Sequence, residues 1–357
     1  MSRPKLIFVT RSRYWRPGNG EAARTAVLID ALAEVCDLTV FFPEQPDAAT
    51  RPFVERSRHR YRLAVGDTAR PERAALVSGL RGMCRQIAPD CVLLSRLQLD
   101  FLRLGVPDGI RLVMDTHDLV SDNAASRASV GVAVEEALDF ERELAFLQHY
   151  DRVLLIQPDD HARVAAVLGE RALCVPHPVV LPAQPVRPDS RVVGYAASQW
   201  VANRHGLQWF IDDVWPALSA ERAELQVAGH IAALLPQPLP EGIHARGFVP
   251  DIEALWSGVD VAINPVRWGS GLKIKTVEAL AAGLPLVSTR EGARGLEDGA
   301  GEAFLLADEA AAFADACRTL LDDLPLRRRY ARAAHLYARD RFSHAACYGG
   351  LIAWLRG

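Results

Sequence analysis

The chain has 357 residues, a formal net charge of −3 and 50% hydrophobic residues. That length favours two α/β domains of roughly 150 to 180 residues. The lack of a basic excess argues against a nucleic-acid partner. The six cysteines form no CxxC pair, which favours reduced, buried thiols over disulfides or a zinc site. No stretch is apolar for long enough to span a membrane, and the apolar run 6–9 is too short for a signal peptide, so we expect a cytoplasmic protein.

Short apolar runs alternate with helix-like segments in the first half of the chain. Continuously apolar runs are typical of strands that are buried on both faces, and they occur at residues 6–9, 38–42, 91–94, 112–114 and 153–156. Helical patterns cover residues 21–34 and 134–149. This alternation predicts βαβ units and a parallel sheet.

A proline-rich stretch, residues 174–189, interrupts the alternation. Proline removes a backbone donor and fixes φ, so we interpret this stretch as an extended linker. A second α/β series follows. Its predicted strands are 192–197, 225–229, 259–264, 285–289 and 303–306, and its predicted helices are 205–218, 251–257, 273–282 and 309–322.

The last helical stretch, 326–354, is predicted to break near Phe342. We therefore expect an N-terminal domain at 1–183, a C-terminal domain at 184–335, and a C-terminal helix at 336–357 that packs back on the N-terminal domain. Ligands of open parallel sheets bind at the carboxyl ends of the strands, which favours a site between the two domains.

The strongest local signal lies between residues 264 and 285. A buried strand is followed by a glycine-containing loop and by a helix that starts near Leu272 and ends at Gly283. Glycines allow close backbone approach, and a helix N-terminus offers free N–H groups and partial positive charge, which suits a diphosphate. Lys273 and Lys275 add positive charge, and the carboxylate of Glu278 can accept hydrogen bonds from a ribose. The alternative is an ordinary amphipathic helix with a solvated basic start.

This stretch resembles the donor-binding signature of the GT-B glycosyltransferases, especially the retaining family 4, also called glycosyl transferases group 1. Further matches follow in order along residues 190–357 and include Asn203-Arg204, Val227-Ala228-Gly229, Gly247-Phe248-Val249, Thr289-Arg290-Glu291-Gly292 and Arg341-Phe342-Ser343. In the first half the matching segments include Gly18-Asn19-Gly20 after the first strand and Asp115-Thr116-His117-Asp118 at the end of a later one.

The resemblance implies two Rossmann-like parallel-sheet domains that face each other across a cleft. It also implies transfer of a sugar from a nucleotide diphosphate sugar to a hydroxyl acceptor, with retention of configuration. We expect no cofactor and no metal, since no DxD motif is present. The residues assigned to catalysis are His117, Lys273 and Glu278. Those assigned to donor binding are Gly20, Asn203, Arg204, Gly269, Ser270, Gly271, Leu272 and Lys275.

Two departures from the family pattern concern the donor. Retaining members often carry a glutamate eight positions before the one that matches Glu278, but this chain has Ser270 there. Many members also carry an Arg and a Lys after the first strand of the C-terminal domain, whereas this chain offers only Arg204. We expect Lys273 and Lys275 to supply the missing charge.

Arginine alternates with other residues at Arg56, Arg58, Arg60 and Arg62. In an extended chain these side chains share one face. One interpretation is a solvated charged edge. The other is contact with an anionic acceptor or with lipid headgroups, which would place the protein peripherally at the inner membrane face.

Two other functions are open to this sequence, and a third is disfavoured. A GT-B-like sugar-nucleotide epimerase would use the same site without an acceptor. A catalytically silent glycosyltransferase-like subunit would act through a partner protein. A nicotinamide-dependent dehydrogenase is disfavoured, because neither of the first βα turns of the two halves contains GxGxxG.

Overall fold

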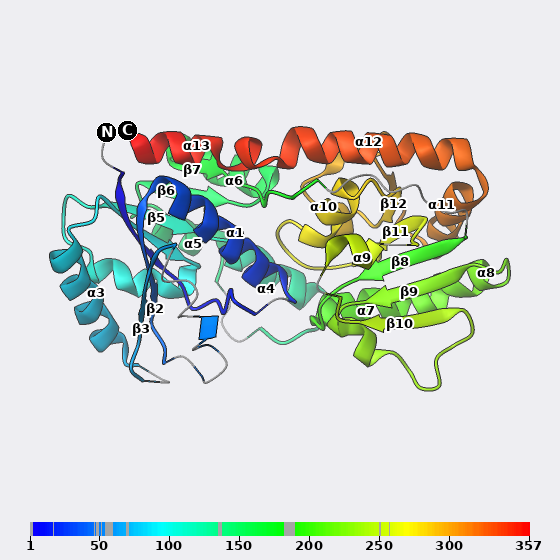
Figure 1. The fold of residues 1–357 in the computed structure, drawn as a ribbon, viewed down its shortest axis with the longest axis horizontal. Helices are drawn as coiled ribbons and strands as arrows, with labels where there is room; N and C mark the ends of the chain where they lie inside the picture. Colours follow the sequence, from blue (N-terminus) through cyan, green and yellow to red (C-terminus); the bar gives the residue numbers. More distant parts are fainter. Residues whose placement is uncertain are drawn as a thin grey trace.

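The computed structural model describes residues 3–16, 18–45, 47, 50, 52–53, 60–68, 71–134, 138–181, 190–249, 251–256 and 258–357. Within these residues, two parallel sheets occupy the two halves of an elongated molecule, and helices cover both (Figure 1). The prediction of an α/β protein with two Rossmann-like domains is confirmed.

The first sheet has the strand order β3-β2-β1-β4-β5-β6-β7 among the described residues. Its strands are β1 (Lys5–Val9), β2 (Asp37–Phe42), β3 (Arg62–Val65), β4 (Cys91–Ser95), β5 (Arg111–Asp115), β6 (Arg152–Leu155) and β7 (Ala172–Cys174). The five strands predicted for this half are present. Because the order reverses between β1 and β4, the loops that follow these two strands diverge and leave room for a ligand.

Helices cover both faces of this sheet. They are α1 (Gly20–Val35), α3 (Arg73–Ile87), α4 (Val120–Ser129), α5 (Phe140–Leu147) and α6 (Pro158–Leu168), with 3-10 segments at Leu97–Gly105 and Gly169–Arg171. The helix predicted at 134–149 is shorter than expected, because α5 begins only at Phe140, where the side chain of Asp139 caps it.

The second sheet has the order β10-β9-β8-β11-β12-β13. Its strands are β8 (Val192–Ala196), β9 (Glu224–Ala228), β10 (Ile243–Gly247), β11 (Val261–Asn264), β12 (Leu286–Ser288) and β13 (Leu305–Leu306). Its helices are α7 (Val201–Trp209), a π-helical turn (Phe210–Val214), α8 (Trp215–Ser219), α9 (Ile252–Trp256), α10 (Ile274–Ala281) and α11 (Ala310–Asp322), with 3-10 segments at His230–Leu234, Glu291–Ala293 and Glu297–Gly299.

Two C-terminal helices run along both halves. The first, α12 (Leu324–Phe342), packs on α10, and the second, α13 (His344–Arg356), packs on α1 and β7 (Figure 1). A break at Ser343 separates the two helices, and the side chain of this serine caps α13. Helix α13 thus packs on the first half, whereas the limits of the predicted domains at 183 and 335 stay predictions.

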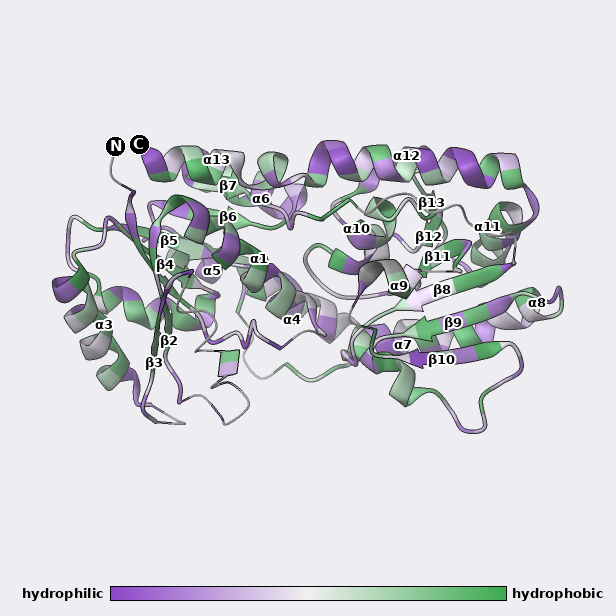
Figure 2. Cartoon of the chain, viewed as in Figure 1, coloured by the Kyte–Doolittle hydropathy of each residue, from purple (hydrophilic) through white to green (hydrophobic). Residues whose placement is uncertain are grey.

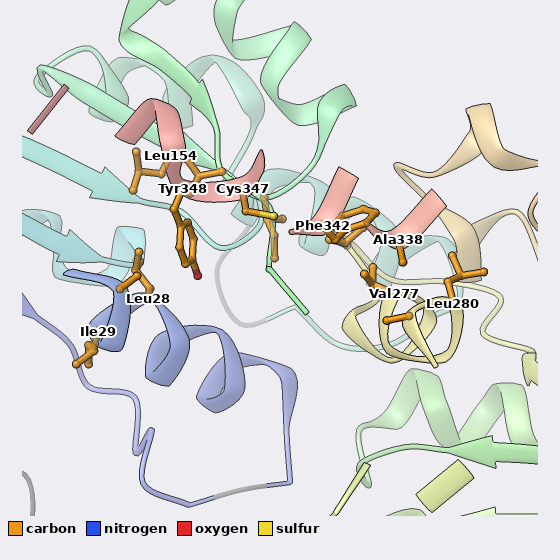
Figure 3. Close-up of a cluster of buried hydrophobic side chains, with 14 of the residues drawn as sticks. Leu28, Ile29, Leu154, Val277, Leu280, Ala338, Phe342, Cys347 and Tyr348 are labelled. Carbon is orange, nitrogen blue, oxygen red and sulfur yellow. The ribbon is translucent and has the colours of Figure 1, made fainter. Parts of the chain in front are cut away.

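One apolar cluster continues from one half to the other beneath these helices. Leu28 of α1 and Tyr348 of α13 lie on one side, and Val277 of α10 and Phe342 of α12 lie on the other (Figure 3). Hydrophobic residues are concentrated in the strands of both sheets, whereas the length of α12 carries many hydrophilic ones (Figure 2). In the part of the chain that is described, no helix has the length and apolarity that crossing a bilayer requires.

Candidate functional site

The loop 265–273 leads from β11 into α10, which begins at Ile274, two residues later than the sequence predicts. The N-cap position is Lys273, and no side chain caps this helix. Backbone N–H groups in the first turn of a helix lack intrahelical partners, so an uncapped start is suited to bind an anion.

Lys273 is buried, with 8% of its surface exposed. Its Nζ donates to the carbonyl oxygens of Ser270 (3.3 Å) and Gly271 (3.0 Å) and lies 2.7 Å from Glu291 Oε1. Burial lowers the pKa of the ammonium, and the Glu291 carboxylate opposes that shift. Lys273 therefore holds the loop in shape and has a carboxylate partner, which sequence reasoning missed.

Lys275 has a different environment. Its Nζ contacts the Tyr195 hydroxyl (3.1 Å) and Asn203 Oδ1, and it lies 5.0 Å from the centroid of the Tyr195 ring. Burial, followed by the charge of Lys273, holds the pKa of Lys275 well below its usual value. No carboxylate of a described residue forms an ion pair with Lys275, so its charged form lacks a counterion.

Glu278 lies one turn further along α10 and is half-buried. Burial raises the pKa of its carboxyl group to about 7. A group with this pKa exchanges its proton near neutral pH, so its ability to accept hydrogen bonds depends on pH in that range.

The glycine loop of the first half approaches this helix. A β-carbon on Gly20 would lie 3.3 Å from Ile274 Cδ1, and one on Gly18 would lie 3.2 Å from the ring of His230. Asn19 caps α1, since its side chain accepts from Ala22 N at 2.7 Å. The N-termini of α1 and α10 therefore meet at the boundary between the two halves.

His117 follows β5 and adopts a positive φ of 62°. The Asp118 N–H donates to the Thr116 carbonyl at 2.9 Å, which closes a three-residue γ-turn around the histidine. His117 Nε2 lies 3.1 Å from Ser95 Oγ and 3.1 Å from Asp115 Oδ2. Such a turn costs energy, and strained residues of this kind concentrate at functional sites.

A buried ion pair between Arg24 and Asp115 lies beside that turn. Asp115 pairs with Arg24 of α1, whose NH1 also donates to the Val175 carbonyl at 2.9 Å. His177 lies nearby with 4% exposure, and burial, followed by Arg24 and His117, lowers its pKa to about 3. His177 is therefore neutral at physiological pH.

Four polar residues of the segment 118–126, in the first half, contact either the donor loop (residues 265–273) or Arg294. Ser270 Oγ donates to Asp118 Oδ2 and accepts from Asn123 Nδ2 at 2.9 Å. The Gly269 N–H donates to Ser126 Oγ at 2.7 Å. Arg294 donates to Asp122 Oδ2 at 3.3 Å. Sequence reasoning missed these contacts, although Asp118 stands in the segment 115–118, which is one of those that carry the resemblance to the family.

The structure separates Arg204 from this group. It lies exposed on α7, and its guanidinium forms no ion pair or side-chain hydrogen bond with a described residue. Asn203 is buried and joins α7 to α10 through its contact with Lys275. Leu272 lines a cavity of about 480 Å³ between the halves, together with Ile156 and Phe342.

The structure describes two of the four arginines in the cluster. Arg56 and Arg58 lie outside the described residues. Arg60 pairs with Asp30 at 2.8 Å, and Arg62 pairs with Asp37 at 2.8 Å. Both ion pairs are exposed to solvent, which favours the interpretation of Arg60 and Arg62 as part of a solvated charged edge.

Comparison with known proteins gives one family match. Residues 190–323 match the model described as glycosyl transferases group 1. A protein from Klebsiella pneumoniae, an uncharacterized 44.6 kDa protein in the cps region, is 26% identical over 124 residues, which are 31% of this chain and 32% of that protein. The chain thus matches about a third of the length of this curated relative.

Two solved structures resemble the whole chain. Sucrose-phosphate synthase from Thermosynechococcus elongatus has a TM-score of 0.75 at 16% identity, over 99% of this chain and 98% of that one. HepE from Anabaena, in complex with UDP and glucose, has a TM-score of 0.73 at 17% identity, over 99% and 100%. Residues 190–323 thus resemble glycosyl transferases group 1, and the chain as a whole has the same fold as these two solved structures.

Proposed function

We propose that the chain transfers a sugar from a nucleotide diphosphate sugar to a hydroxyl group of an acceptor, with retention of configuration. The observation that carries this proposal is the half-buried amine of Lys275, which has no carboxylate partner among the described residues and lies beside the uncapped start of α10. A diphosphate at this position would stabilise the charged lysine and would accept hydrogen bonds from the first turn of the helix.

The same arrangement suits the reaction. The acceptor oxygen bonds to the anomeric carbon and loses its proton, while the nucleotide diphosphate leaves with the electron pair of the broken C–O bond. Negative charge therefore grows on the leaving phosphate, where fixed positive charge lowers the barrier. The N–H groups at the start of α10 and Lys275, which a bound diphosphate would keep charged, supply that charge, so we expect no requirement for a metal.

The roles of the other groups follow from their places relative to the start of α10. Glu278, one turn along α10, accepts hydrogen bonds from the ribose. His117 faces the sugar from the first half, and the Gly18–Gly20 loop closes over the phosphates. We propose a UDP-sugar as the donor, which is supported by the complex of the structurally similar HepE with UDP and glucose.

Thermal unfolding tests this proposal. We expect the midpoint to rise with UDP or with a UDP-sugar, since a ligand at a hundred times its Kd stabilises the folded state by about 2.7 kcal/mol. A panel with the diphosphates of the other bases tests the choice of UDP. If no nucleotide or sugar nucleotide raises the midpoint, the donor site is assigned wrongly.

Product analysis separates transfer from the alternatives. A transferase releases UDP at an appreciable rate only when an acceptor hydroxyl is present, whereas an epimerase converts the donor sugar in the absence of an acceptor. A silent subunit would bind the donor without turnover. We expect release of UDP that depends on the acceptor and a product in which the configuration of the donor is kept.

A further inference from the structure

The start of α4 and the donor loop meet at the boundary between the two halves of the molecule (Figure 1). The central contact joins Asp118 to Ser270: the serine hydroxyl donates to Oδ2 of the aspartate. Asn123 donates to the same hydroxyl at 2.9 Å. A carboxylate of the first half therefore lies directly against residue 270 of the second.

Asp118 is held in place by its own backbone and by the helix that follows. Its N–H closes the γ-turn around His117. After Leu119, the residues Val120 and Ser121 donate their N–H groups to the buried carboxylate of Glu143, each at 2.8 Å. The direction of the Asp118 side chain is thus fixed by the end of β5 on one side and by α4 on the other.

The donor loop is shaped to accept this carboxylate. Gly271 has a φ of 63°, and a β-carbon on it would lie 3.0 Å from Asp118 Cβ. A larger residue at 271 would push the two segments apart. The loop therefore brings its backbone against Asp118 at the point where it turns toward Lys273 and α10.

One oxygen of Asp118 is not committed to this contact. Oδ1 accepts no hydrogen bond from a described residue, and its nearest cation is Arg96 NH2, at 3.9 Å. The side chain of Asp118 is 22% exposed. An ionised carboxylate accepts hydrogen bonds only, and its two oxygens can serve different donors. Oδ1 is thus available to hydroxyl groups that enter between the two halves.

We propose that Asp118 supplies, from the first half of the molecule, the carboxylate that holds hydroxyl groups of the donor sugar. The inference rests on the proposed function, because it takes the diphosphate to lie at the start of α10. A sugar bonded to that diphosphate would lie beside this loop, where Asp118 is the carboxylate that the first half brings into contact with it, whereas Glu291 of the second half is already paired with Lys273. Residue 270 itself, a serine, offers only a hydroxyl.

The substitution Asp118→Asn tests this assignment. The amide keeps the size of the side chain and an oxygen that can accept from Ser270, but it removes the charge. Binding of UDP and of UDP-glucose is measured by calorimetry on wild type and variant. We expect affinity for UDP-glucose to fall about tenfold or more, as for loss of hydrogen bonds to a charged group, while affinity for UDP changes less than twofold.

Asp122→Asn is the matched control. Asp122 lies one turn further along α4 and also bridges the halves, through Arg294, but it does not touch Ser270. If the role of Asp118 were only to join the halves, both variants would lower the affinities for UDP and UDP-glucose alike. Equal losses in the two variants therefore overturn the proposal, and so does a D118N variant that binds UDP-glucose as wild type does.

Failure of the proposed function has its own signature. If wild type binds neither UDP nor any sugar nucleotide, the donor site is misplaced and the role of Asp118 falls with it. If wild type binds both ligands and D118N matches it, the proposed function stands and only the assignment of Asp118 is wrong.

Discussion

Arg24 and Asp115 form an ion pair that is buried on both sides, with 2.7 Å between NH2 and Oδ1 and side-chain exposures of 1% and 0%. Burial by itself would raise the pKa of Asp115, but the guanidinium of Arg24, followed by His117, holds it below its usual range. The pair fixes the end of β5 against α1. The γ-turn that carries His117 and Asp118 starts from this point.

We predict that Arg24→Met strongly destabilises the protein. Removal of one partner leaves a buried carboxylate uncompensated, at a cost of about 3 to 5 kcal/mol. Arg62→Met is the control, since Arg62 forms an exposed pair with Asp37 and exposed pairs contribute at most about 1 kcal/mol. Urea unfolding of both variants measures the difference. If both variants lost the same free energy of unfolding, the buried Arg24–Asp115 pair would stabilise the protein no more than the exposed Arg62–Asp37 pair does.

We predict that Gly271→Ala weakens both the fold and donor binding. The residue has a φ of 63°, which costs an L-residue about 1 to 2 kcal/mol, and the added methyl group would press on Asp118. Gly349→Ala is the control: the glycine is exposed on α13, with nothing within 4 Å of an added β-carbon. Alanine favours helices, so that variant should be neutral or more stable by up to about 1 kcal/mol. Thermal midpoints with and without UDP separate the two effects on Gly271.

The apolar pattern of the sequence predicts the buried strands but not the partly exposed ones. Strands β1 and β4 have continuously apolar runs because both of their faces are covered. The edge strands β3 and β10 were not identified from periodicity, since both are partly exposed and carry arginines that interrupt an apolar pattern. Position in the sheet, which the local sequence does not encode, decides how apolar a strand must be.

In the candidate site too, one part can be predicted from the sequence and another cannot. The glycines and lysines of the donor loop are close together in the sequence, and their chemistry alone pointed to an anion. The contact between Asp118 and Ser270 joins residues 152 positions apart. Such a contact depends on how the two sheets are placed relative to each other, and no short motif contains that information.

We predict that UDP binding depends on pH through Glu278. Burial raises the pKa of this group to about 7, and only the ionised form accepts two hydrogen bonds from a ribose. Affinity should therefore fall about tenfold between pH 8 and pH 6, as expected for a ligand that requires the ionised form of a group with this pKa. Glu278→Gln should bind UDP more weakly and without this dependence, which calorimetry at several pH values measures.

Glu278 also makes the stability of the ligand-free protein depend on pH, but in the opposite direction: a rise in pH strengthens UDP binding and lowers stability. Because the folded pKa lies above the unfolded value, the unfolded carboxyl ionises first as the pH rises. The free energy of unfolding should therefore decrease between about pH 4.5 and pH 7, and Glu278→Gln should remove that contribution. A stability profile that is identical in wild type and variant would contradict a raised pKa at Glu278.

We predict that Lys275, rather than Arg204, is required for diphosphate binding. Both are basic residues of the second half, but Lys275 is half-buried at the start of α10 without a carboxylate partner among the described residues, whereas Arg204 is exposed on α7. Charge in a water-poor site interacts more strongly with a phosphate than charge at a solvated surface does. Lys275→Met should therefore abolish the rise in thermal midpoint that UDP produces in wild type, and Arg204→Met should keep most of it. The reverse result would move the diphosphate away from α10 and toward the exposed end of α7.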